Sequence, residues 1–285
     1  MTTKKNFIKS PLNYTGGKYK LLSQIIPLFP QNIDTFVEPF AGGLNVSLNV
    51  QANSYVLNDG CTELIELWNF FKIVDLKSFL YDIDKKISYY DLSLHNVEGY
   101  NKLREDRNKS KDNSLLLFLL ICYGFNHQIR FNNKGDFNIP FGKERSSYNK
   151  VIKKNLIDTI QRIQSYKNLT FTNIDFRKID FSKLGSNDFV YCDPPYYITT
   201  ATYNSCWGEK EEIELLETLS NLNKKGTKFA LSNVLEHHGQ VNEILKNWIE
   251  ENNIKVIDLN MTYKNSNYHK KEKSSSSREV LVCNY

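Results

Sequence analysis

Residues 188–198 read DFVYCDPPYYI, a strand-like run that ends at a pair of prolines. An apolar run of strand length, residues 189–192, leads directly into two consecutive prolines. Proline cannot donate to the hydrogen-bond ladder and its ring fixes φ, so the strand has to end there on a rigid backbone. In a parallel sheet that end is the carboxyl edge, where α/β proteins bind their ligands. We therefore expect four residues at such an edge: Asp193, Pro194, Pro195 and Tyr196.

Other strand-like runs alternate with helix-like segments on both sides of this stretch. They are residues 35–38, 55–58, 169–174, 228–231 and 279–283. Between residues 63 and 155 the pattern changes to helical stretches, such as 115–122, and polar, charge-mixed loops, such as 101–113. The simplest interpretation is an α/β domain formed by residues 1–62 and 156–285, which an inserted, mainly helical module of residues 63–155 splits in two.

The residue types at positions 193–196 suit chemistry on an aromatic amine. The lone pair of such a nitrogen is delocalised into the ring, which makes it a poor nucleophile. Asp193 could accept one amino hydrogen and the rigid carbonyl of Pro194 the other, which would draw the nitrogen toward tetrahedral geometry. The Tyr196 ring could stack on the base. Positioning of this kind can contribute about 7–11 kcal/mol. A strand-ending turn without chemistry is the alternative.

Two motifs with paired glycines lie nearer the N-terminus. In FVEPFAGG, residues 36–43, a strand turns through Gly42, and glycine there lets the backbone approach a ligand closely. The next strand leads into Asp59, which can accept the hydroxyls of a ribose or cap a helix. In NYTGGKYKLL, residues 13–22, the glycines before Lys18 are typical of an anion cradle or of a surface turn. Neither motif matches the Rossmann G-x-G-x-x-G or the Walker P-loop.

Composition limits the function classes. Hydrophobic residues make up 40% of the 285 residues, and no apolar run approaches the roughly 18 residues needed to cross a bilayer. The first residues lack a secretory signal, so we expect a cytoplasmic protein. The five cysteines and five histidines form no zinc pattern, which predicts reduced thiols and no metal. A formal charge of +5 permits a polyanionic partner without requiring one.

The chain resembles the Dam-like (D12 class) N6-adenine DNA methyltransferases in the order of its motifs. These are T-G-G-K at residues 15–18, E-P-F-x-G-G at 38–43, N-D at 58–59, D-P-P-Y at 193–196, L-S-N at 231–233 and S-R-E-V-L-V-x-N-Y at 277–285. The resemblance covers nearly the whole chain. It implies a seven-stranded, mostly parallel, Rossmann-like methyltransferase sheet. It also implies transfer of the methyl group of S-adenosyl-L-methionine to N6 of a flipped-out adenine in double-stranded DNA.

The resemblance further implies the residues of the cofactor site. Those that would bind S-adenosyl-L-methionine are Tyr14, Gly17, Lys18, Glu38, Phe40, Gly42, Asp59, Asp175, Phe176 and Asp193. Tyr14 stands where many relatives carry Trp, and it keeps an aromatic ring there. Asp175 and Phe176 look like the family's acidic-aromatic pair beside the cofactor adenine. Residues 193–196 would form the catalytic tetrad, and Ser232–Asn233 would help to close the pocket.

Within the inserted module, residues 123–143 read YGFNHQIRFNNKGDFNIPFGK and match the hairpin with which family members enter the major groove. The residues that would contact DNA are Tyr123, Phe125, Asn126, His127, Gln128, Arg130 and Asn132. Arg suits guanine O6 and N7, and Asn or Gln suits adenine. A polar hairpin with buried rings is the alternative. His127 and Gln128 depart from the N-G-L-x-R hairpin of the GATC-methylating branch, so we expect another recognition sequence, with Arg130 still reading a guanine.

Other functions share the D-P-P-Y chemistry. Cytosine N4 presents a similar amine, although enzymes acting on it more often carry Ser in place of Asp193. RNA and protein-amide methyltransferases usually carry Asn there, and a DNA-binding protein with an inactive methyltransferase fold is an alternative from another class. As partners we expect double-stranded DNA and no membrane, for a monomer or weak dimer. A restriction–modification enzyme with a cognate restriction endonuclease, a phage enzyme and a solitary regulator would share the same motifs. The basic loop at residues 264–278 would grip phosphates or be merely solvated.

Overall fold

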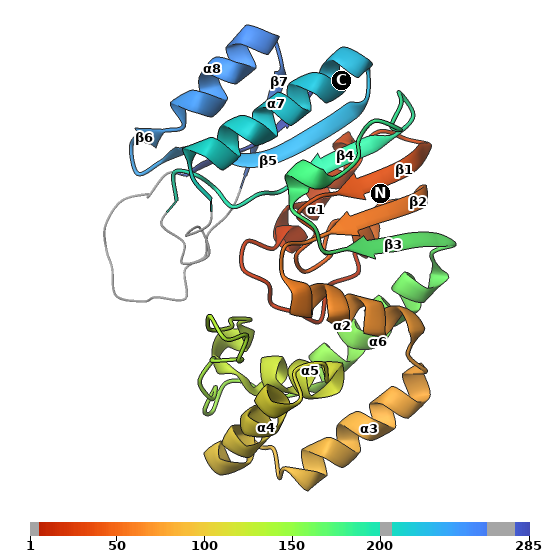
Figure 1. Cartoon of the computed structure of the whole chain (residues 1–285), viewed down its shortest axis with the longest axis vertical. Helices are drawn as coiled ribbons and strands as arrows, with labels where there is room; N and C mark the ends of the chain where they lie inside the picture. The colour runs from red at the N-terminus through yellow and green to blue at the C-terminus, as the bar shows by residue number, and fades with distance from the viewer. Residues whose placement is uncertain (1–5, 200–206, 261–276) are drawn as a thin grey trace. The chain divides into compact units, whose positions relative to one another are not determined.

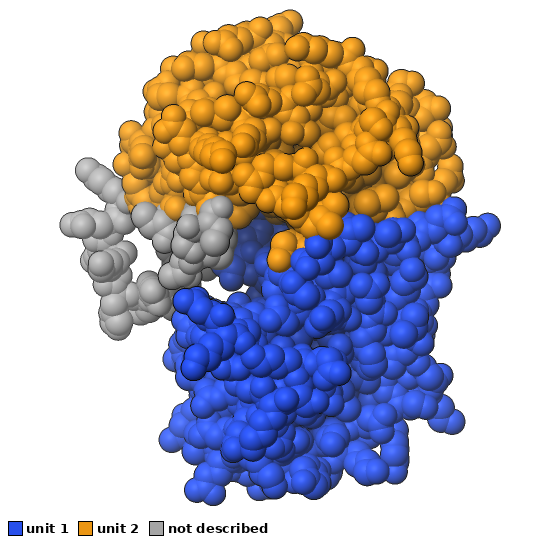
Figure 2. Space-filling model, in the orientation of Figure 1, with its two compact units in different colours: residues 1–19, 42–49, 61–173 blue, residues 20–41, 50–60, 174–285 orange. Residues whose placement is uncertain are grey.

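The computed structural model describes residues 6–199, 207–260 and 277–285. The chain divides into two compact units, which Figure 2 shows in different colours. Unit 1 comprises residues 1–19, 42–49 and 61–173, and unit 2 comprises residues 20–41, 50–60 and 174–285. Each unit is therefore assembled from three separate pieces of the sequence.

Unit 2 is built on a β-sheet (Figure 1). Its described strands are β1 (Ile33–Glu38), β2 (Ala52–Asn58), β4 (Phe189–Cys192), β5 (Lys228–His237), β6 (Gln240–Val241), β7 (Lys255–Leu259) and β8 (Arg278–Cys283). Their order across the sheet is β2, β1, β4, β5, β8, β7, and β6 pairs with β5. The neighbours β2, β1, β4 and β5 run parallel, whereas β8 runs antiparallel to both β5 and β7.

β4 is buried on both faces. The rings of Phe189 and Tyr191 lie 4.7 and 5.3 Å from the ring of Phe29. Val190 and Cys192 instead belong to the apolar core that contains residues of α7 (Glu209–Lys225) and α8 (Glu243–Asn252). Successive side chains of a strand point to opposite faces, so a strand that is apolar at every position needs cover on both sides.

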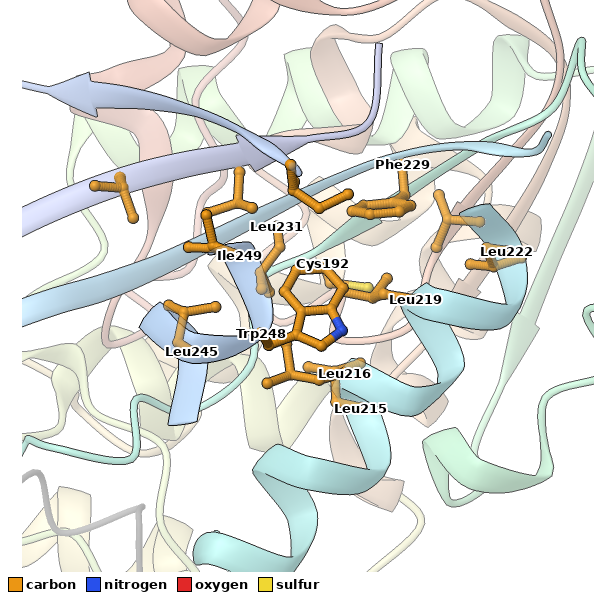
Figure 3. Close-up of a cluster of buried hydrophobic side chains, with 14 of the residues drawn as sticks. Cys192, Leu215, Leu216, Leu219, Leu222, Phe229, Leu231, Leu245, Trp248 and Ile249 are labelled. Carbon is orange, nitrogen blue, oxygen red and sulfur yellow. The ribbon is translucent and has the colours of Figure 1, made fainter. Parts of the chain in front are cut away.

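The apolar core of unit 2 lies between the sheet and its two long helices (Figure 3). Leucines recur on one face of α7 and are at most 3% exposed: Leu215, Leu216, Leu219 and Leu222. Trp248 of α8 packs among them, and its indole N–H donates to Ser220 Oγ at 2.8 Å. The shorter helical elements of unit 2 are α1 (Leu22–Ile25), η2 (Ile26–Leu28) and η5 (Phe176–Lys178), and η1 (Lys18–Leu21) precedes α1.

Unit 1 is mainly helical. Its elements are η3 (Ser47–Asn49), α2 (Thr62–Ile73), α3 (Leu76–Tyr89), α4 (Val97–Lys109), α5 (Ser114–Tyr123), η4 (Phe125–His127), α6 (Lys150–Ser165) and β3 (Asn168–Thr172). The sequence of α5, SLLLFLLICY, is apolar all round because residues 116–123 are all buried. The rings of Phe71, Phe79 and Phe118 lie within 6.2 Å of one another and join α2, α3 and α5.

The expected polar loop at residues 101–113 is wrong over most of its length, because α4 extends to Lys109. Asn96 caps this helix by accepting a backbone N–H from its first turn. Tyr100, Leu103 and Arg107 form its buried face at helical spacing. The buried face of α4 is narrow and includes an arginine. The sequence of α4 therefore shows no clear apolar repeat at helical spacing, and it looks like a charged loop.

The expected α/β fold with a central, mostly parallel sheet is confirmed. The strand pattern did not predict β7, and β5 continues six residues beyond the predicted end at Leu231. The inserted recognition module stays a prediction. Most of the basic loop at residues 264–278 lies outside the described residues. None of the helices in the described ranges is both long enough and apolar enough to cross a membrane.

We predict that Leu219→Ala lowers the free energy of unfolding by about 2–5 kcal/mol, because it leaves a cavity in a fully buried part of the core. Ile213→Ala on the same helix is the matched control. Ile213 is 39% exposed, so its truncation should cost about 0.5 kcal/mol or less. Denaturant titration of both variants measures the difference. Equal costs would show that this face of α7 does not carry the core.

Candidate active site and recognition segment

Carboxylates gather at the ends of parallel strands in unit 2. β1 ends at Glu38, whereas Asp59 and Asp193 directly follow the ends of β2 and β4. The register of β1 with β2 and with β4 aligns these ends, so the residues share one edge of the sheet. Glu38 is only 2% exposed. The structure therefore brings together acidic residues that come from distant parts of the sequence, at the edge where parallel sheets bind ligands.

The Asn58 side chain forms hydrogen bonds with two turns at this edge of the sheet. Its amide group donates to the carbonyl oxygens of Pro39 and Ile174, at 2.9 and 3.0 Å, and its Oδ1 accepts the Ile174 N–H at 3.0 Å. Its own carbonyl accepts the Ala41 N–H at 2.7 Å. Asn58 is 1% exposed, so these bonds are shielded from water. The side chain thus fixes the turns after β1 and before η5, which carry predicted cofactor-binding residues.

An aromatic cluster lies beside these turns. The ring of Phe40 is 5.3 Å from that of Phe176 and 5.4 Å from that of Trp207. Phe176 and Trp207 are themselves 5.5 Å apart and are nearly buried. The motifs predicted the two phenylalanines but not Trp207, which lies outside every motif of the sequence.

A buried carboxylate, Glu212 of α7, anchors the tryptophan. Its Oε2 accepts the Trp207 indole N–H at 2.9 Å, and its Oε1 accepts side-chain amide hydrogens from Asn233 and Asn242 at 3.0 and 2.9 Å. Burial raises the pKa of Glu212, and the three N–H donors oppose that rise. Glu212 thereby links the aromatic cluster to β5 and to the N-cap of α8.

Asp175 is held by a salt bridge. The Arg177 guanidinium donates to Asp175 Oδ1 at 2.7 Å and pairs with Oδ2 as well. Hydrogen bonds from Arg177 lower the pKa of Asp175 to about 2. Arg177 also donates to Glu214 of α7 at 2.8 Å. The acidic-aromatic pair predicted from the sequence is therefore an ionised carboxylate next to a nearly buried ring.

The tetrad at residues 193–196 has a defined arrangement. The Tyr196 hydroxyl lies 3.1 Å from Asp193 Oδ1 and 3.2 Å from Glu279 Oε1 of β8. Burial, followed by the charges of both carboxylates, raises the pKa of Tyr196 well above its ordinary value. Below the tetrad, the hydroxyls of Tyr191 and Ser232 are 2.8 Å apart. Tyr196 thus remains a neutral hydroxyl that can donate to either carboxylate.

In unit 1, the two glycine motifs pack against each other. A Cβ on Gly42, whose φ is +46°, would lie 3.0 Å from the Tyr14 ring, so only glycine fits beneath this ring without displacement. The Gly17 N–H donates to the Tyr14 carbonyl at 3.1 Å, and the Lys18 ammonium donates to the Gly16 carbonyl at 2.9 Å. Three predicted cofactor-binding residues of unit 1, Tyr14, Gly17 and Lys18, therefore belong to one compact turn, and the fourth, Gly42, packs against its tyrosine ring.

The predicted hairpin at residues 123–143 contains an antiparallel bridge between Phe131 and Phe137. Asn132 organises its turn, since its Oδ1 accepts the N–H groups of Lys134 and Asp136, both at 2.9 Å. Its amide donates to the Asp136 carboxylate at 3.2 Å. The Asn132 side chain is thus engaged within the turn.

Arg130 is held across the same hairpin. Its Nε donates to Asn138 Oδ1 at 2.8 Å, and its Nη2 donates to the Asn138 carbonyl at 3.3 Å. An exposed arginine otherwise samples many rotamers, so Asn138 reduces the freedom that binding would remove. The outward pair of N–H groups, one on each Nη, is not used in these bonds.

The other predicted recognition residues differ in exposure. Tyr123 is 3% exposed and packs inside unit 1, in contrast to its expected place against DNA, because it is the last residue of the buried α5. Phe125, Asn126 and Gln128 are exposed, and His127 is half-buried. Asn126 and His127 have φ values of 53° and 54°. Asparagine and histidine adopt this left-handed region more often than most residues other than glycine.

α4 holds the hairpin from the side. The Asn108 side chain donates to the Phe137 carbonyl at 3.1 Å and accepts the Phe137 N–H at 2.8 Å. Arg107 is fully buried, donates to the Gly135 carbonyl at 3.1 Å and lies 4.9 Å from the centre of the Phe131 ring. Through these contacts α4 fixes the backbone position of the hairpin at residues 135–137.

Known proteins show similarity along nearly all of the chain. A family model described as D12 class N6 adenine-specific DNA methyltransferase matches residues 14–263. Modification methylase StsI of Streptococcus sanguinis is 43% identical over 100% of this chain and 44% of its own length. Type II methyltransferase M.FokI of Planomicrobium okeanokoites is 45% identical over 98% and 43%. DNA adenine methylase of Escherichia coli strain K12 is 32% identical over 68% and 66%. The chain spans less than half the length of the two modification methylases.

We predict that Asn108→Ala speeds amide hydrogen exchange at Phe137 by about 2- to 10-fold, because it removes the acceptor of that N–H, and such a bond contributes about 0.5–1.5 kcal/mol. Lys109→Ala, at the neighbouring and solvent-exposed position, is the control and should leave this exchange rate unchanged. An unaltered rate in the Asn108 variant would show that α4 does not hold the segment.

Proposed function

The chain belongs to the D12 class N6 adenine-specific DNA methyltransferases, and we propose that it transfers the methyl group of S-adenosyl-L-methionine to N6 of adenine in double-stranded DNA. The observation that carries the proposal is the position of Asp193 and Tyr196 directly after β4, at the carboxyl edge of the parallel strands. Of the base amines weighed from the sequence, adenine N6 fits best with an aspartate at the head of this motif and with the matched family.

The chemistry asks two things of the protein at this edge. The amine must lose its planarity, and an acceptor must stand close enough to take an N–H hydrogen bond. The Asp193 carboxylate would accept one amino hydrogen and the Pro194 carbonyl the other. The consecutive prolines keep that carbonyl rigid, so the gain comes from positioning rather than from a new covalent bond to the enzyme.

The residues of unit 2 fit the nucleoside part of the cofactor. The aromatic pair Phe40 and Phe176 offers ring faces to an adenine, and Asp175 beside it is ionised and can accept hydrogen bonds. Glu38 and Asp59 place carboxylates at the same edge, where ribose hydroxyls would donate to them. When bound, the cofactor supplies a methyl group already activated by its sulfonium charge, so we propose no metal.

Unit 1 carries the remaining cofactor-binding residues in this proposal. The turn formed by Tyr14, Gly17 and Lys18, against which Gly42 packs, exposes backbone groups near a lysine ammonium, a combination that suits a carboxylate. The inserted recognition module, with boundaries near residues 63 and 155, is part of the same proposal.

Reaching the amine requires the target base to leave the duplex. A stacked adenine cannot enter a site at a sheet edge, so we propose base flipping, which costs a few kcal/mol. The ring of Tyr196, partly exposed and anchored through its hydroxyl, would stack on the flipped base and offset part of this cost.

We propose that the segment around residues 125–132 reads the recognition sequence. Arg130 would bind guanine O6 and N7 through its outward N–H pair. Other contacts with the DNA would come from Phe125, Asn126, His127 and Gln128. Asn132 would support the turn in this role. Tyr123, being buried, would support the segment from within unit 1.

The biological setting proposed here is restriction–modification. The two relatives at 43% and 45% identity are named as a modification methylase and a type II methyltransferase. A cognate restriction endonuclease would then recognise the same DNA sequence. We propose that the chain acts on DNA as a monomer or weak dimer.

The direct experiment is methyl transfer from labelled S-adenosyl-L-methionine to unmethylated DNA, followed by nucleoside analysis. N6-methyladenine is the expected product. N4-methylcytosine would overturn the choice of base, and cofactor binding without any DNA product would overturn DNA as the substrate.

We predict that Asp193→Ala abolishes methyl transfer while cofactor affinity, measured by calorimetry, stays within a few-fold of the wild type. The carboxylate is assigned to the amine, whereas most cofactor contacts come from other residues. Asp180→Ala, which removes an exposed carboxylate of unit 2, is the control and should leave both quantities unchanged. Parallel loss of binding and transfer would move Asp193 to the cofactor site.

We further predict that Arg130→Ala costs about 1–3 kcal/mol of discrimination at one guanine of the recognition sequence. Sequencing the modified positions on mixed-sequence DNA measures this loss. Lys134→Ala, in the turn of the same hairpin, is the control and should weaken binding without changing preference, as a phosphate contact would. An unchanged preference in the Arg130 variant would remove its guanine-reading role.

A further inference from the structure

The direction of β8 brings an acidic residue to the catalytic edge. β8 runs antiparallel to β5, so its first residues lie where the parallel strands end. Glu279 pairs in register with Val234, beyond the level at which β4 stops. It is the acidic member of a strand whose other residues from 280 to 283 are apolar, and it is only 5% exposed. A charge buried at this place needs a partner.

The Tyr196 hydroxyl contacts both Glu279 and Asp193. Tyr196 has one hydroxyl proton, with Asp193 Oδ1 at 3.1 Å and Glu279 Oε1 at 3.2 Å. That proton can form a full hydrogen bond with only one carboxylate at a time. The hydroxyl therefore couples the two acids, although they belong to strands that are separated by β5 in the sheet.

We propose that Glu279 is a positioning residue for methyl transfer, which holds Tyr196 and, through its hydroxyl, sets the orientation and the proton affinity of Asp193. This inference rests on the function proposed above and adds a residue to it. Glu279 would touch neither the cofactor nor the base.

The geometry has a direct electrostatic consequence. Two carboxylates that share one hydrogen-bond donor cannot both carry full charge without repulsion, so each raises the proton affinity of the other. The titratable groups of unit 2 that face this cluster from neighbouring elements are Glu38 of β1 and Tyr191 and Cys192 of β4. Burial raises the pKa of both Tyr191 and Cys192, so they stay neutral, and the Glu38 carboxyl group contributes to the same rise.

A raised proton affinity at Asp193 suits the proton balance of the reaction. The N6 lone pair forms the new N–C bond, and the electron pair of the broken C–S bond stays on sulfur. The methylated nitrogen then carries one proton in excess. Asp193, already hydrogen-bonded to that nitrogen, would accept this proton and release it to solvent as the product leaves. A neighbouring Glu279 makes the carboxylate a better acceptor for this step.

Two substitutions separate the charge of Glu279 from the hydroxyl of Tyr196, and a third serves as the control. Glu279→Gln keeps an acceptor oxygen for the Tyr196 hydroxyl but removes the charge. Tyr196→Phe keeps the ring and removes the hydroxyl that couples the acids. Glu250→Gln changes the same chemical group on the exposed side of α8 and is the control. Circular dichroism and cofactor calorimetry establish that each variant is folded.

The measurement is the pH profile of kcat. With Glu279→Gln we expect the acid limb to move to lower pH by about one unit, the scale at which two titrating groups count as coupled. The sign follows because removal of a like charge lowers the pKa of Asp193. Tyr196→Phe removes the hydroxyl between Asp193 and Glu279 and should reduce kcat. Glu250→Gln should match the wild type. An acid limb that stays in place, or an equal loss of kcat at every pH, would overturn the proposal.

A second readout does not depend on turnover. Carbon-13 NMR of the Asp193 carboxyl group should show a lower titration midpoint in Glu279→Gln than in the wild type, and an unchanged midpoint would overturn the coupling. Wild-type protein that fails to methylate DNA would overturn the proposed function, while this titration would still decide whether Glu279 acts on Asp193.

Discussion

Parallel pairing of β2, β1, β4 and β5 is the constraint on which the candidate active site depends. Parallel strands in register end at a common level. The residues that follow each strand therefore lie close together, although they are far apart in the sequence. The pairing requires cover on both faces, which explains why β4 is apolar at every position. Pro194 and Pro195 then prevent β4 from continuing, and the polar chemistry begins where the ladder stops.

Two buried carboxylates of unit 2, Glu212 and Glu279, have different hydrogen-bond environments. Glu212 accepts three N–H groups and so joins α7, β5 and α8 into a rigid frame. Glu279 instead shares a hydroxyl with a second carboxylate. The first arrangement supplies three donors to one carboxylate, whereas the second places one hydroxyl between two carboxylates. In the proposed reaction Asp193 accepts a proton, and the nearby Glu279 would raise the proton affinity of Asp193 for that step.

The recognition segment of unit 1 is organised differently. Contacts from α4 go largely to backbone carbonyls of the hairpin, through Arg107 and Asn108, and Tyr100 donates to the Ile139 carbonyl at 2.9 Å. Backbone contacts place few demands on the side chains of the segment itself. Exposed residues such as Gln128 can therefore be exchanged while the hairpin keeps its path, and under the proposed function such exchanges would alter the DNA sequence that is recognised.

The strand before the prolines, the glycine turns and the order of the motifs could be predicted from the amino-acid sequence, because the strand end and the turns follow from local backbone chemistry and the order can be read directly. For the same reason Asp193 and Tyr196 could be predicted as site residues, and this assignment stays a prediction. The tertiary structure alone decided that Glu279, 83 residues beyond Tyr196, reaches the same hydroxyl, and that Trp207 completes the aromatic cluster. It also decided that Tyr123 is buried and that α4 is a helix. Such contacts depend on strand direction, register and packing between elements, and no local pattern of residues encodes these.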